Sequence, residues 1–511
     1  MRIVFPRLTG LIRRPQLRSA NRTLLRAIPF AGLCFAIGCG NTSSSQPAAK
    51  VFSNASLQGN YTYALSGSYF NSMSGNGPYQ EAGTFVADGN GNITSGIDDF
   101  VQNSALSSGQ LTGSYAIAND GTGKMTLNLA RGKIHLAITL ISGSALYLIE
   151  FDSFATGAGV VRQQSTAAFS AVPSGTFIFH LHSSHANNAV LGSVSSVGSM
   201  TVKDGAIDGQ EDVVRAGVPG SSGITGSMTA PSTNGRGTAV FTDDAGIQSS
   251  YIYYVIDFST LKFLETDPGP LGSGQADAQT GGPFSDASLN NGFAFSCAGD
   301  TLTSRFGVNG AGVFVSDGNG NIVSGTYDSV QDGSPTSNVA LSGMYNVESN
   351  GRTTIALNPK GLSPIPVIAW MANSSKAYFL VNTPNLAEDG RLEQQQNSPF
   401  SAASLNGTLA FYMYGYFTQT LLSIDRVGVL DFDGSSTVTF TNYFANHDGS
   451  TAQNGPVAGN YAVSPNGRVV AFSVGAANTQ VIYLVSDSSG YIILGASGTE
   501  VAGYIGQQTP P

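Results

Sequence analysis

The chain has 511 residues, of which 41% are hydrophobic and 11% charged, and its 32 acidic residues exceed its 23 Lys and Arg for a formal net charge of −9. This length exceeds what one hydrophobic core supports and predicts several domains, while the hydrophobic content excludes wholesale disorder. The excess of acid repels phosphate backbones and argues against a nucleic-acid partner. The 64 glycines, with frequent Thr, Val, Tyr and Phe, are typical of short strands joined by tight turns.

Residues 1–38 are expected to be a lipoprotein signal peptide. Seven arginines and no acid precede the apolar run from Ala27 to Ile37, which is too short for a membrane span and fits a signal sequence. Ala36-Ile37-Gly38-Cys39 resembles a bacterial lipobox, although Ala36 stands where Leu is usual. The resemblance implies that Cys39 takes a diacylglyceryl group. This lipid would anchor the exported protein in the cell envelope, at the outer membrane.

Cleavage before Cys39 would remove seven of the 23 basic residues, leaving 16 basic and 32 acidic residues and a net charge of −16. Cys297 would be the other cysteine of the mature chain, and a lipidated Cys39 excludes an intramolecular disulfide. Residues 39–50 are rich in Ser, Thr, Pro and Ala and are expected to form a flexible tether. Arg13-Arg14 leaves a twin-arginine signal as the alternative for the N-terminus.

A turn-forming stretch repeats along the rest of the chain. Asp88-Gly89-Asn90-Gly91-Asn92-Ile93 returns almost letter for letter at 317–322, and weaker copies begin at Asp204 and Asp433, so that consecutive copies are 116, 113 and 116 residues apart. Such turns between β-rich flanks favour hairpins because they need positive φ. The period predicts four equivalent units. Their expected boundaries are 51–166, 167–281, 282–397 and 398–511.

The four units share landmarks at both ends. Each opens on Phe-Ser, and three close on a Gln pair, while the second ends less regularly near Gln279. The opening residues are Phe52, Phe169, Phe284 and Phe400, and the closing pairs are Gln163-Gln164, Gln394-Gln395 and Gln507-Gln508. The links between units are only a few residues long, which predicts that consecutive units touch in a semi-rigid string.

Strand-like runs separated by turn residues fill each unit. In the first unit they cover about 60–66, 81–87, 93–101, 110–118, 124–130, 133–141, 145–151 and 159–164. In the first run Tyr61, Tyr63 and Leu65 alternate with Thr62 and Ala64, and the positions that align with the three are apolar in every unit. We therefore predict an all-β protein of four tandem antiparallel up-and-down β-barrel-like domains of about eight strands each. Propeller blades and a two-sheet sandwich in each unit are the rival architectures.

His180, His182 and His185 form a His-x-His-x-x-His cluster in the second unit. On a strand His180 and His182 point to the same side, and His185 can fold back from the following loop to complete a transition-metal site. The aligned positions elsewhere are small residues or tyrosines, so an ordinary polar outer face is the alternative. No cofactor is expected.

Tyr412, Tyr414 and Tyr416 alternate with Phe411 and Met413. The tyrosines therefore lie on the outer face of their strand and are expected to form an exposed stripe. Such a stripe stacks against a glycan or a surface protein. Packing against the third unit is the alternative.

Three acid pairs, Asp98-Asp99, Glu211-Asp212 and Asp243-Asp244, are poor candidates for acid/base catalysis. Adjacent residues of a strand point to opposite faces, so we expect these side chains to be solvated. The chain contains no Gly-x-Ser-x-Gly elbow, phosphate loop, dinucleotide fingerprint or His-Glu-x-x-His motif. The sequence therefore predicts that the protein is not an enzyme.

Asp88, Asn90 and Asn92 have the spacing that begins a calcium loop, but Ile93 stands where the loop needs Gly, which favours a hairpin turn. Trp370 and Cys297 have apolar surroundings in the sequence and are expected to be buried.

The motifs that recur in the four units resemble a family. The Phe-Ser-x-x-Ser-Leu-x-Gly opening, the Ala-Asp-Gly-Asn-Gly-Asn-Ile turn, the Leu-Thr-Gly-Ser-Tyr step and the closing Gln-Gln look like repeat units of secreted lipoproteins from acidobacteria-type soil bacteria, over about Phe52 to Gln508. The resemblance implies location and architecture, and no established activity. Residues 111–117 are also similar in strand pattern to avidin-like or lipocalin-like barrels, an analogy that transfers no ligand residues.

The expected function is that of a lipid-anchored repeat protein of the cell envelope with a non-enzymatic binding, adhesion or structural role. Its expected partners are the membrane, through the lipid, and a glycan or surface protein. One alternative is a carrier of small apolar ligands, which needs empty barrel interiors. The other is a hydrolase of extracellular polymers, which needs a cleft with convergent carboxylates.

Overall fold

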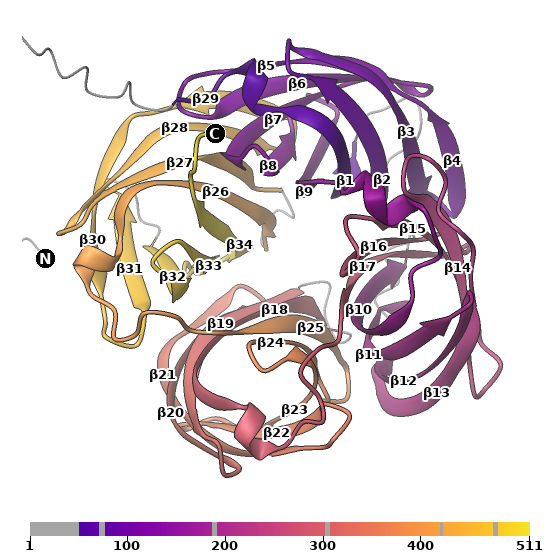
Figure 1. Ribbon diagram of the computed structural model, residues 1–511. Coiled ribbons are helices and arrows are strands. Elements are labelled where there is room, and N and C mark those ends of the chain that lie inside the picture. Colours follow the sequence, from indigo (N-terminus) through magenta and orange to yellow (C-terminus); the bar gives the residue numbers. More distant parts are fainter. Residues whose placement is uncertain (1–50, 71–76, 186–191, 302–306, 419–422, 474–478) are drawn as a thin grey trace, which may run out of the picture. The chain divides into compact units, whose positions relative to one another are not determined.

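The computed structural model describes residues 51–70, 77–185, 192–301, 307–418, 423–473 and 479–511. The predicted signal peptide, Cys39 and the tether at 39–50 lie outside the described residues. The compact unit that spans Lys50–Pro511 contains all the strands (Figure 1).

The strands form four antiparallel barrels in chain order, as predicted. Barrel 1 contains β1(Gln58–Tyr69), β2(Gly77–Asp88), β3(Asn92–Gln102), β4(Ala105–Gln110), β5(Thr112–Ile117), β6(Thr122–Leu129), β7(Gly132–Ser142), β8(Ala145–Glu150) and β9(Ala155–Gln163). Barrel 2 contains β10(Gly175–His185), β11(Val194–Lys203), β12(Ala206–Arg215), β13(Val218–Met228), β14(Arg236–Asp243), β15(Gln248–Val255), β16(Thr260–Glu265) and β17(Pro270–Ala278).

Barrel 3 contains β18(Asn290–Thr301), β19(Gly307–Asp317), β20(Asn321–Gln331), β21(Ser334–Val347), β22(Arg352–Pro359), β23(Ile365–Asn373), β24(Lys376–Val381) and β25(Leu386–Gln394). Barrel 4 contains β26(Asn406–Phe417), β27(Asp425–Asp433), β28(Thr437–His447), β29(Ser450–Asn454), β30(Val457–Val463), β31(Arg468–Ser473), β32(Thr479–Ser486), β33(Ser489–Leu494) and β34(Thr499–Gln507). Short 3₁₀ turns, η1(Asn54–Ser56), η2(Thr166–Phe169), η4(Asp286–Ser288) and η5(Ala402–Ser404), precede the first strand of each barrel.

Barrels 1 and 4 reach the same eight-strand closure as the other two. The fourth strand is split into β4 and β5 in barrel 1, where both parts pair with β3, and into β29 and β30 in barrel 4, where both pair with β28. The first and last strands of each barrel also pair, as β1 does with β9. The predicted fold class is therefore confirmed, and the propeller and sandwich alternatives are wrong.

Each barrel has its own hydrophobic interior. Tyr61, Tyr63 and Leu65 are at most 2% exposed and belong to one buried cluster in barrel 1. The positions that align with them lie in three separate clusters, one in each of the other barrels. They are Phe177, Phe179 and Leu181 in barrel 2, Phe293, Phe295 and Cys297 in barrel 3, and Leu409, Phe411 and Met413 in barrel 4. A period of two with one apolar face thus correctly predicted which face of the first strand is buried.

The repeated Asp-Gly-Asn-Gly-Asn stretch is a hairpin turn. Asp88 Oδ1 accepts hydrogen bonds from the backbone N–H groups of Asn90 at 2.7 Å and Asn92 at 3.0 Å, and Gly89 and Gly91 have φ of +78° and +100°. β3 begins at Asn92, so Ile93 belongs to the strand. The preference for a turn over a calcium loop is confirmed.

A glutamine connects each barrel to the next, and we call this arrangement the glutamine contact. Gln395, which follows barrel 3, donates through Nε2 to the carbonyl of Asn466 at 3.0 Å and to that of Leu484 at 2.7 Å, both in barrel 4. The backbone N–H of Gln396 then donates to the carbonyl of Val485. Gln164 and Gln279 make the same pair of side-chain bonds into barrels 2 and 3.

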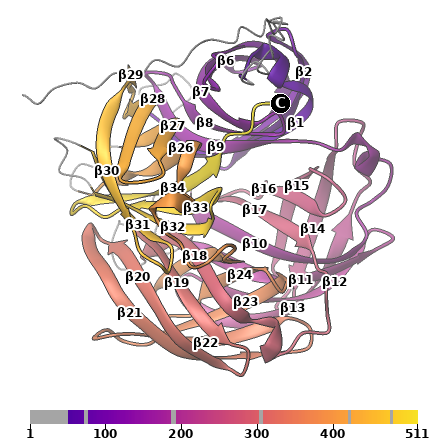
Figure 2. The same cartoon turned by 60° about the vertical axis from the view of Figure 1, so that its left-hand side comes forward.

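The glutamine contact also occurs between the last barrel and the first. Gln508 Nε2 donates to the carbonyls of Asp120 at 2.8 Å and Leu140 at 2.9 Å, and the N–H of Thr509 donates to Ile141. Figures 1 and 2 both show the C-terminus beside barrel 1. The junctions therefore form a closed cycle, 1 to 2 to 3 to 4 to 1. Consecutive units touch as predicted, and the last unit also contacts the first, which the sequence did not predict.

The glycine of each Asn-Gly or Asp-Gly turn makes room for this contact. Gly121 has φ of +82°, and a Cβ there would lie 2.6 Å from Gln508 Nε2. Gly467 has φ of +88°, and its Cβ would lie 2.7 Å from Gln395 Nε2. Both the positive φ and the close approach exclude a side chain.

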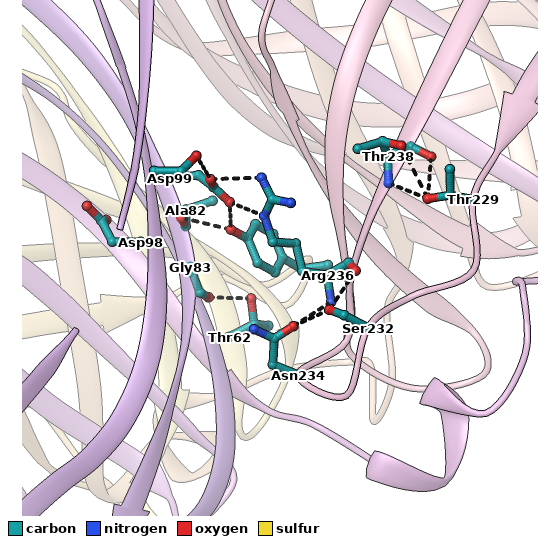
Figure 3. A network of polar contacts seen from close by, with 12 residues as sticks. Thr62, Ala82, Gly83, Asp98, Asp99, Thr229, Ser232, Asn234, Arg236 and Thr238 are labelled. Atoms are coloured by element: carbon teal, nitrogen blue, oxygen red, sulfur yellow. Dashed lines mark hydrogen bonds and ion pairs between the residues drawn. The ribbon is translucent and has the colours of Figure 1, made fainter. Parts of the chain in front are cut away.

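A buried ion pair accompanies three of the four junctions. Asp99 of β3 is 0% exposed and binds Arg236 of barrel 2 through two hydrogen bonds, from Nε at 2.6 Å and Nη2 at 3.0 Å, and it also accepts from Tyr254 (Figure 3). Asp212 binds Arg352 and Trp370 in the same way, and Asp328 binds Arg468 and Tyr483. A bidentate Arg–carboxylate pair fixes orientation as well as contact.

The junction between barrels 4 and 1 has different side chains at these positions. Asp99 and Asp328 each stand eleven residues after the Asp of their turn. Phe444 takes the equivalent position, eleven residues after Asp433, and packs edge-on against Phe151 at a ring distance of 5.4 Å. Asn446, which is 0% exposed, donates to the carbonyls of Glu150 and Ala155, both at 2.9 Å. β26 and β27 lie against β7 and β8 here (Figure 2).

We predict that Gln508→Leu weakens the junction between barrels 4 and 1. Two carbonyls would lose their side-chain donor, which costs about 2 kcal/mol of unfolding free energy. Urea denaturation of the variant measures this loss. Gln507→Leu is the matched control, because the neighbouring Gln507 is exposed. Equal effects of the two substitutions would contradict the role assigned to the contact.

Candidate functional site

Two of the three acid pairs, Asp98-Asp99 and Glu211-Asp212, are buried, so the expectation that they are solvated is wrong. Asp98 and Glu211 are 4% and 8% exposed and point into barrels 1 and 2, whereas Asp99 and Asp212 are at most 1% exposed and point outward to the junctions. The prediction that adjacent acids of a strand point to opposite faces is confirmed. The expectation of solvation failed because the arginine partners lie more than 130 residues away in sequence. Of the third pair, Asp244 is exposed.

Barrel 1 encloses a cluster of carboxylates. Arg131 binds Glu81 at 2.6 Å and also Asp98, while Glu150 is 0% exposed and burial raises its pKa well above the usual range. Glu81, Asp98 and Glu150 lie inside the barrel wall and are at most 4% exposed. Carboxylates that are shielded from solvent in this way do not reach a polymer chain, which argues against the hydrolase alternative.

The barrel interiors are filled by side chains. A space in barrel 3, beside Phe295, Cys297 and Glu388, measures about 40 Å³. That volume holds one or two water molecules, whereas pockets for organic ligands are typically several hundred Å³. The filled interiors argue against the carrier alternative. Cys297 is buried as expected, and burial raises the pKa of its thiol.

His180 and His182 point to the same side of β10, as predicted, and meet a carboxylate from barrel 3. Asp389 accepts from His180 Nδ1 at 3.0 Å and binds His182 Nδ1 at 2.9 Å. His182 Nε2 faces Asp300, and although burial alone would lower the pKa of His182, its bonds to Asp300 and Asp389 raise it to about 10. His182 thus forms an ion pair, and His180 a hydrogen bond, with Asp389 across the junction of barrels 2 and 3.

This cluster does not have the geometry of a metal site or of a catalytic triad. His185 ends β10, but its side chain lies outside the described residues, and within the described part of the chain no three His, Cys, Asp or Glu side chains are placed to hold a metal. Ser195 Oγ lies 2.9 Å from His182 Nδ1, the nitrogen that also binds Asp389. A triad needs the hydroxyl at the other nitrogen and a neutral imidazole.

The three tyrosines of β26 have three different environments. Tyr412 is 7% exposed and packs against Tyr147 of barrel 1 at a ring distance of 4.6 Å, so the expectation that it is exposed is wrong. Tyr416 accepts a hydrogen bond from the N–H of Gly307 in barrel 3, as the packing alternative foresaw. Tyr414 is 40% exposed and stacks on Tyr412 at 5.9 Å. Only Tyr414 presents its ring to solvent.

The closed cycle brings structurally equivalent outward positions together. We call these positions the outward row; in each barrel it has one residue on the first strand, one on the last and one on the seventh. In that order the residues are Ala64, Val160 and Tyr147 in barrel 1, His180, Gln275 and Lys262 in barrel 2, Ser296, Arg391 and Tyr378 in barrel 3, and Tyr412, Tyr504 and Tyr491 in barrel 4. β9, β17, β25 and β34 face one another in Figure 1. The inward faces of these strands are largely apolar, with Glu150 and Glu388 as buried acids among them, but this outward row differs in every barrel.

Members of the row touch across three junctions. His180 stacks on Tyr378 at 4.3 Å between barrels 2 and 3, and Arg391 lies over the ring of Tyr504 at 5.0 Å between barrels 3 and 4. Between barrels 4 and 1, Tyr412 contacts Tyr147. Between barrels 1 and 2, Ala64 packs against a buried cluster that contains Leu264 and Leu271 of barrel 2. The charge of Arg162 of barrel 1 also helps to lower the pKa of Lys262 of barrel 2. All four barrels therefore contribute to one region.

We call the solvent-accessible part of this region the central patch. It contains Arg162, Lys262, Gln275, Arg391, Tyr414 and Tyr504. Arg162 and Tyr414 are exposed and the others are half-buried. The sequence-based prediction found one member, Tyr414. The others were missed because they lie on last or seventh strands, although a comparison of the four repeats at those positions would have shown their divergence.

A comparison with models of known protein families finds no match, and no curated protein matches the chain. Among the residues that the structure describes, no helix has both the length and the apolar character needed to cross a membrane.

We predict that Glu388→Gln stabilises the protein at alkaline pH. Burial raises the pKa of Glu388 from 4.5 to about 7, so the stability that its protonated form contributes is complete below pH 4.5 and is lost as the pH rises to 7. At about 1.4 kcal/mol per pKa unit, the variant gains up to about 3 kcal/mol at pH 8 and almost nothing at pH 4. Urea denaturation at both pH values measures the difference.

Glu348→Gln is the control for the loss of one negative charge, since the Glu348 side chain is 47% exposed. A gain of the same size at pH 4 and pH 8 would contradict the role of proton binding by Glu388.

Proposed function

We propose that this chain is an exported, lipid-anchored protein of the cell envelope that binds a ligand without transforming it, and that the central patch is the binding site. The observation that carries the proposal is the divergence of the outward row. Positions that are equivalent in the four barrels converge in one region, and each barrel supplies a different chemistry there. An asymmetric ligand requires such a site.

The aromatic part of the patch supports a glycan as the ligand. Tyr414 offers an exposed ring, and Tyr504 stacks on Tyr412 at 5.5 Å, which holds the neighbouring rings in fixed orientations. Tyrosine combines a flat apolar face with a polar hydroxyl, which suits sugars that have apolar faces and polar edges. Rigid rings lose little conformational entropy on binding.

The ion pairs and buried carboxylates support a role other than catalysis. His182 is held protonated between Asp300 and Asp389, and a protonated imidazole does not act as a general base. The carboxylates of barrel 1 are occupied by Arg131 or shielded by the barrel wall. These titratable groups are therefore paired at junctions or enclosed in barrel interiors.

We predict that Tyr414→Ala reduces glycan binding about tenfold, which equals a loss of about 1.4 kcal/mol. A glycan array with the purified mature chain identifies the ligand, and isothermal titration calorimetry measures its affinity. Phe258→Ala is the matched control, because Phe258 is a 70% exposed aromatic residue outside the patch. Equal losses in both variants would overturn the assignment of the site. Cleaved glycan after prolonged incubation would overturn the non-enzymatic role.

We predict that the mature chain begins at Cys39 and carries a diacylglyceryl group there. Mass spectrometry of the N-terminal peptide from membrane fractions would show the lipid mass, and Cys39→Ser would remove both the lipid and the cleavage. An N-terminus elsewhere, or an unmodified Cys39, would contradict the anchor.

A further inference from the structure

Unpaired cations gather in the central patch of a chain that is otherwise acidic. Arg162, Lys262 and Arg391 come from three different barrels, and among the described residues no carboxylate lies within 4.0 Å of any of their charged groups. The chain has an excess of acids, 32 against 23 Lys and Arg. Two acids lie near them: Glu393 of β25, whose charge helps to raise the pKa of Arg391, and Asp277, which binds Lys376. The basic groups Arg162, Lys262, Arg391 and Lys376 outnumber these two acids, although acids predominate in the chain as a whole.

Other basic side chains near the patch and at the junctions form ion pairs with acidic residues. Lys376 of β24, two residues from Tyr378, binds Asp277 at 2.5 Å. Arg236, Arg352 and Arg468 each bind a buried aspartate at a junction. Arg391 instead lies over the ring of Tyr504, and its strand neighbour is Tyr378. Its guanidinium retains donors that can still bind a planar anion.

The three cations also oppose one another. Burial, together with the charges of Arg391, Arg162 and Lys376, lowers the pKa of Lys262 to about 7, against the opposing effect of Asp277. Like charges held together in a partly desolvated region cost free energy in the absence of an anion. A bound anion offsets this cost, which makes the region complementary to negative charge before any ligand arrives.

We propose that the central patch binds an acidic carbohydrate, with the carboxylate or sulfate of the sugar between Arg162, Lys262 and Arg391 and a face of the sugar ring against Tyr414 and Tyr504. This inference rests on the proposed binding function and adds the ligand class. Arg and Lys bind acidic groups through charge-assisted hydrogen bonds. Gln275 of β17, which pairs with Lys262 of β16, donates through Nε2 to the hydroxyl of Tyr378 at 2.8 Å and to Asp277 at 3.1 Å, and its amide carbonyl can accept from a sugar hydroxyl. The adjacent tyrosine faces select a ring over a simple ion.

The site should respond to pH through Lys262. The charged groups that face it are Arg162, Arg391, Lys376 and Asp277, and His180 lies near it with a pKa that burial lowers. As the pH rises from 6 to 8, Lys262 loses its proton and the patch loses one of its cations. The affinity for an acidic sugar therefore falls with rising pH, and Lys262→Arg, which stays charged, removes this dependence.

The test compares oligogalacturonate with a neutral galactan oligosaccharide of the same length, with inorganic sulfate as a third probe, by calorimetry on the mature chain. We expect Arg391→Met to weaken oligogalacturonate binding at least tenfold and to leave neutral sugars unaffected. Lys203→Met is the matched control, since Lys203 is exposed on barrel 2 outside the patch. A thermal melt of each variant checks folding, and Lys262→Arg serves as the second variant if Arg391→Met unfolds.

The outcomes separate this inference from the proposed function. Equal binding of the neutral and acidic sugars, with Tyr414→Ala still harmful, overturns the acidic ligand and leaves the binding site in place. Binding of sulfate as tight as that of oligogalacturonate overturns the carbohydrate and leaves an anion site. A pH dependence that persists in Lys262→Arg overturns the role of Lys262. If Tyr414→Ala and Arg391→Met both leave binding unchanged, the proposed function fails as well.

Discussion

The structure depends on one repeated hydrogen-bonding arrangement, in which a glutamine at the end of a barrel donates to two carbonyls of the next. Each carbonyl pair belongs to a turn and a strand whose geometry a glycine fixes, so the contact sets the orientation of the second barrel as well as its distance. An interface that joins unlike surfaces of successive units produces a closed cycle when its rotation divides a full turn. The contact between Gln508 and barrel 1 shows that four units meet this condition.

Closure of the cycle changes the environment of the outward faces of the strands. In an open string the outward row of each barrel would face solvent and would have little reason to differ from the others. In the cycle these rows face one another, so the differences between His180, Ser296 and Tyr412 become differences within a single site. The constant inward residues stabilise four separate cores, and the variable outward residues determine the chemistry of the central patch.

The four junctions share one contact and differ in a second one. The glutamine contact is common to all four, whereas the buried Asp–Arg pair occurs at three and is replaced by Phe444 and Asn446 at the fourth. A buried ion pair specifies orientation more than it adds stability, because desolvation offsets much of the attraction. The junction that joins the chain ends instead uses aromatic packing and an amide that satisfies backbone carbonyls, and neither of these introduces a buried charge.

The sequence by itself determined the class of fold, the eight-strand meander and the inward face of each first strand, because a period of two and an Asp-Gly-Asn turn act within a dozen residues. It also predicted that Cys297 and Trp370 are buried. It did not determine the cycle, since Gln508 and Asp120 are 388 residues apart and nothing local reports the rotation between barrels. For the same reason the burial of Asp99, the loss of exposure at Tyr412 and the meeting of Arg162, Lys262 and Arg391 were decided only by tertiary structure, which alone places the faces of distant strands together.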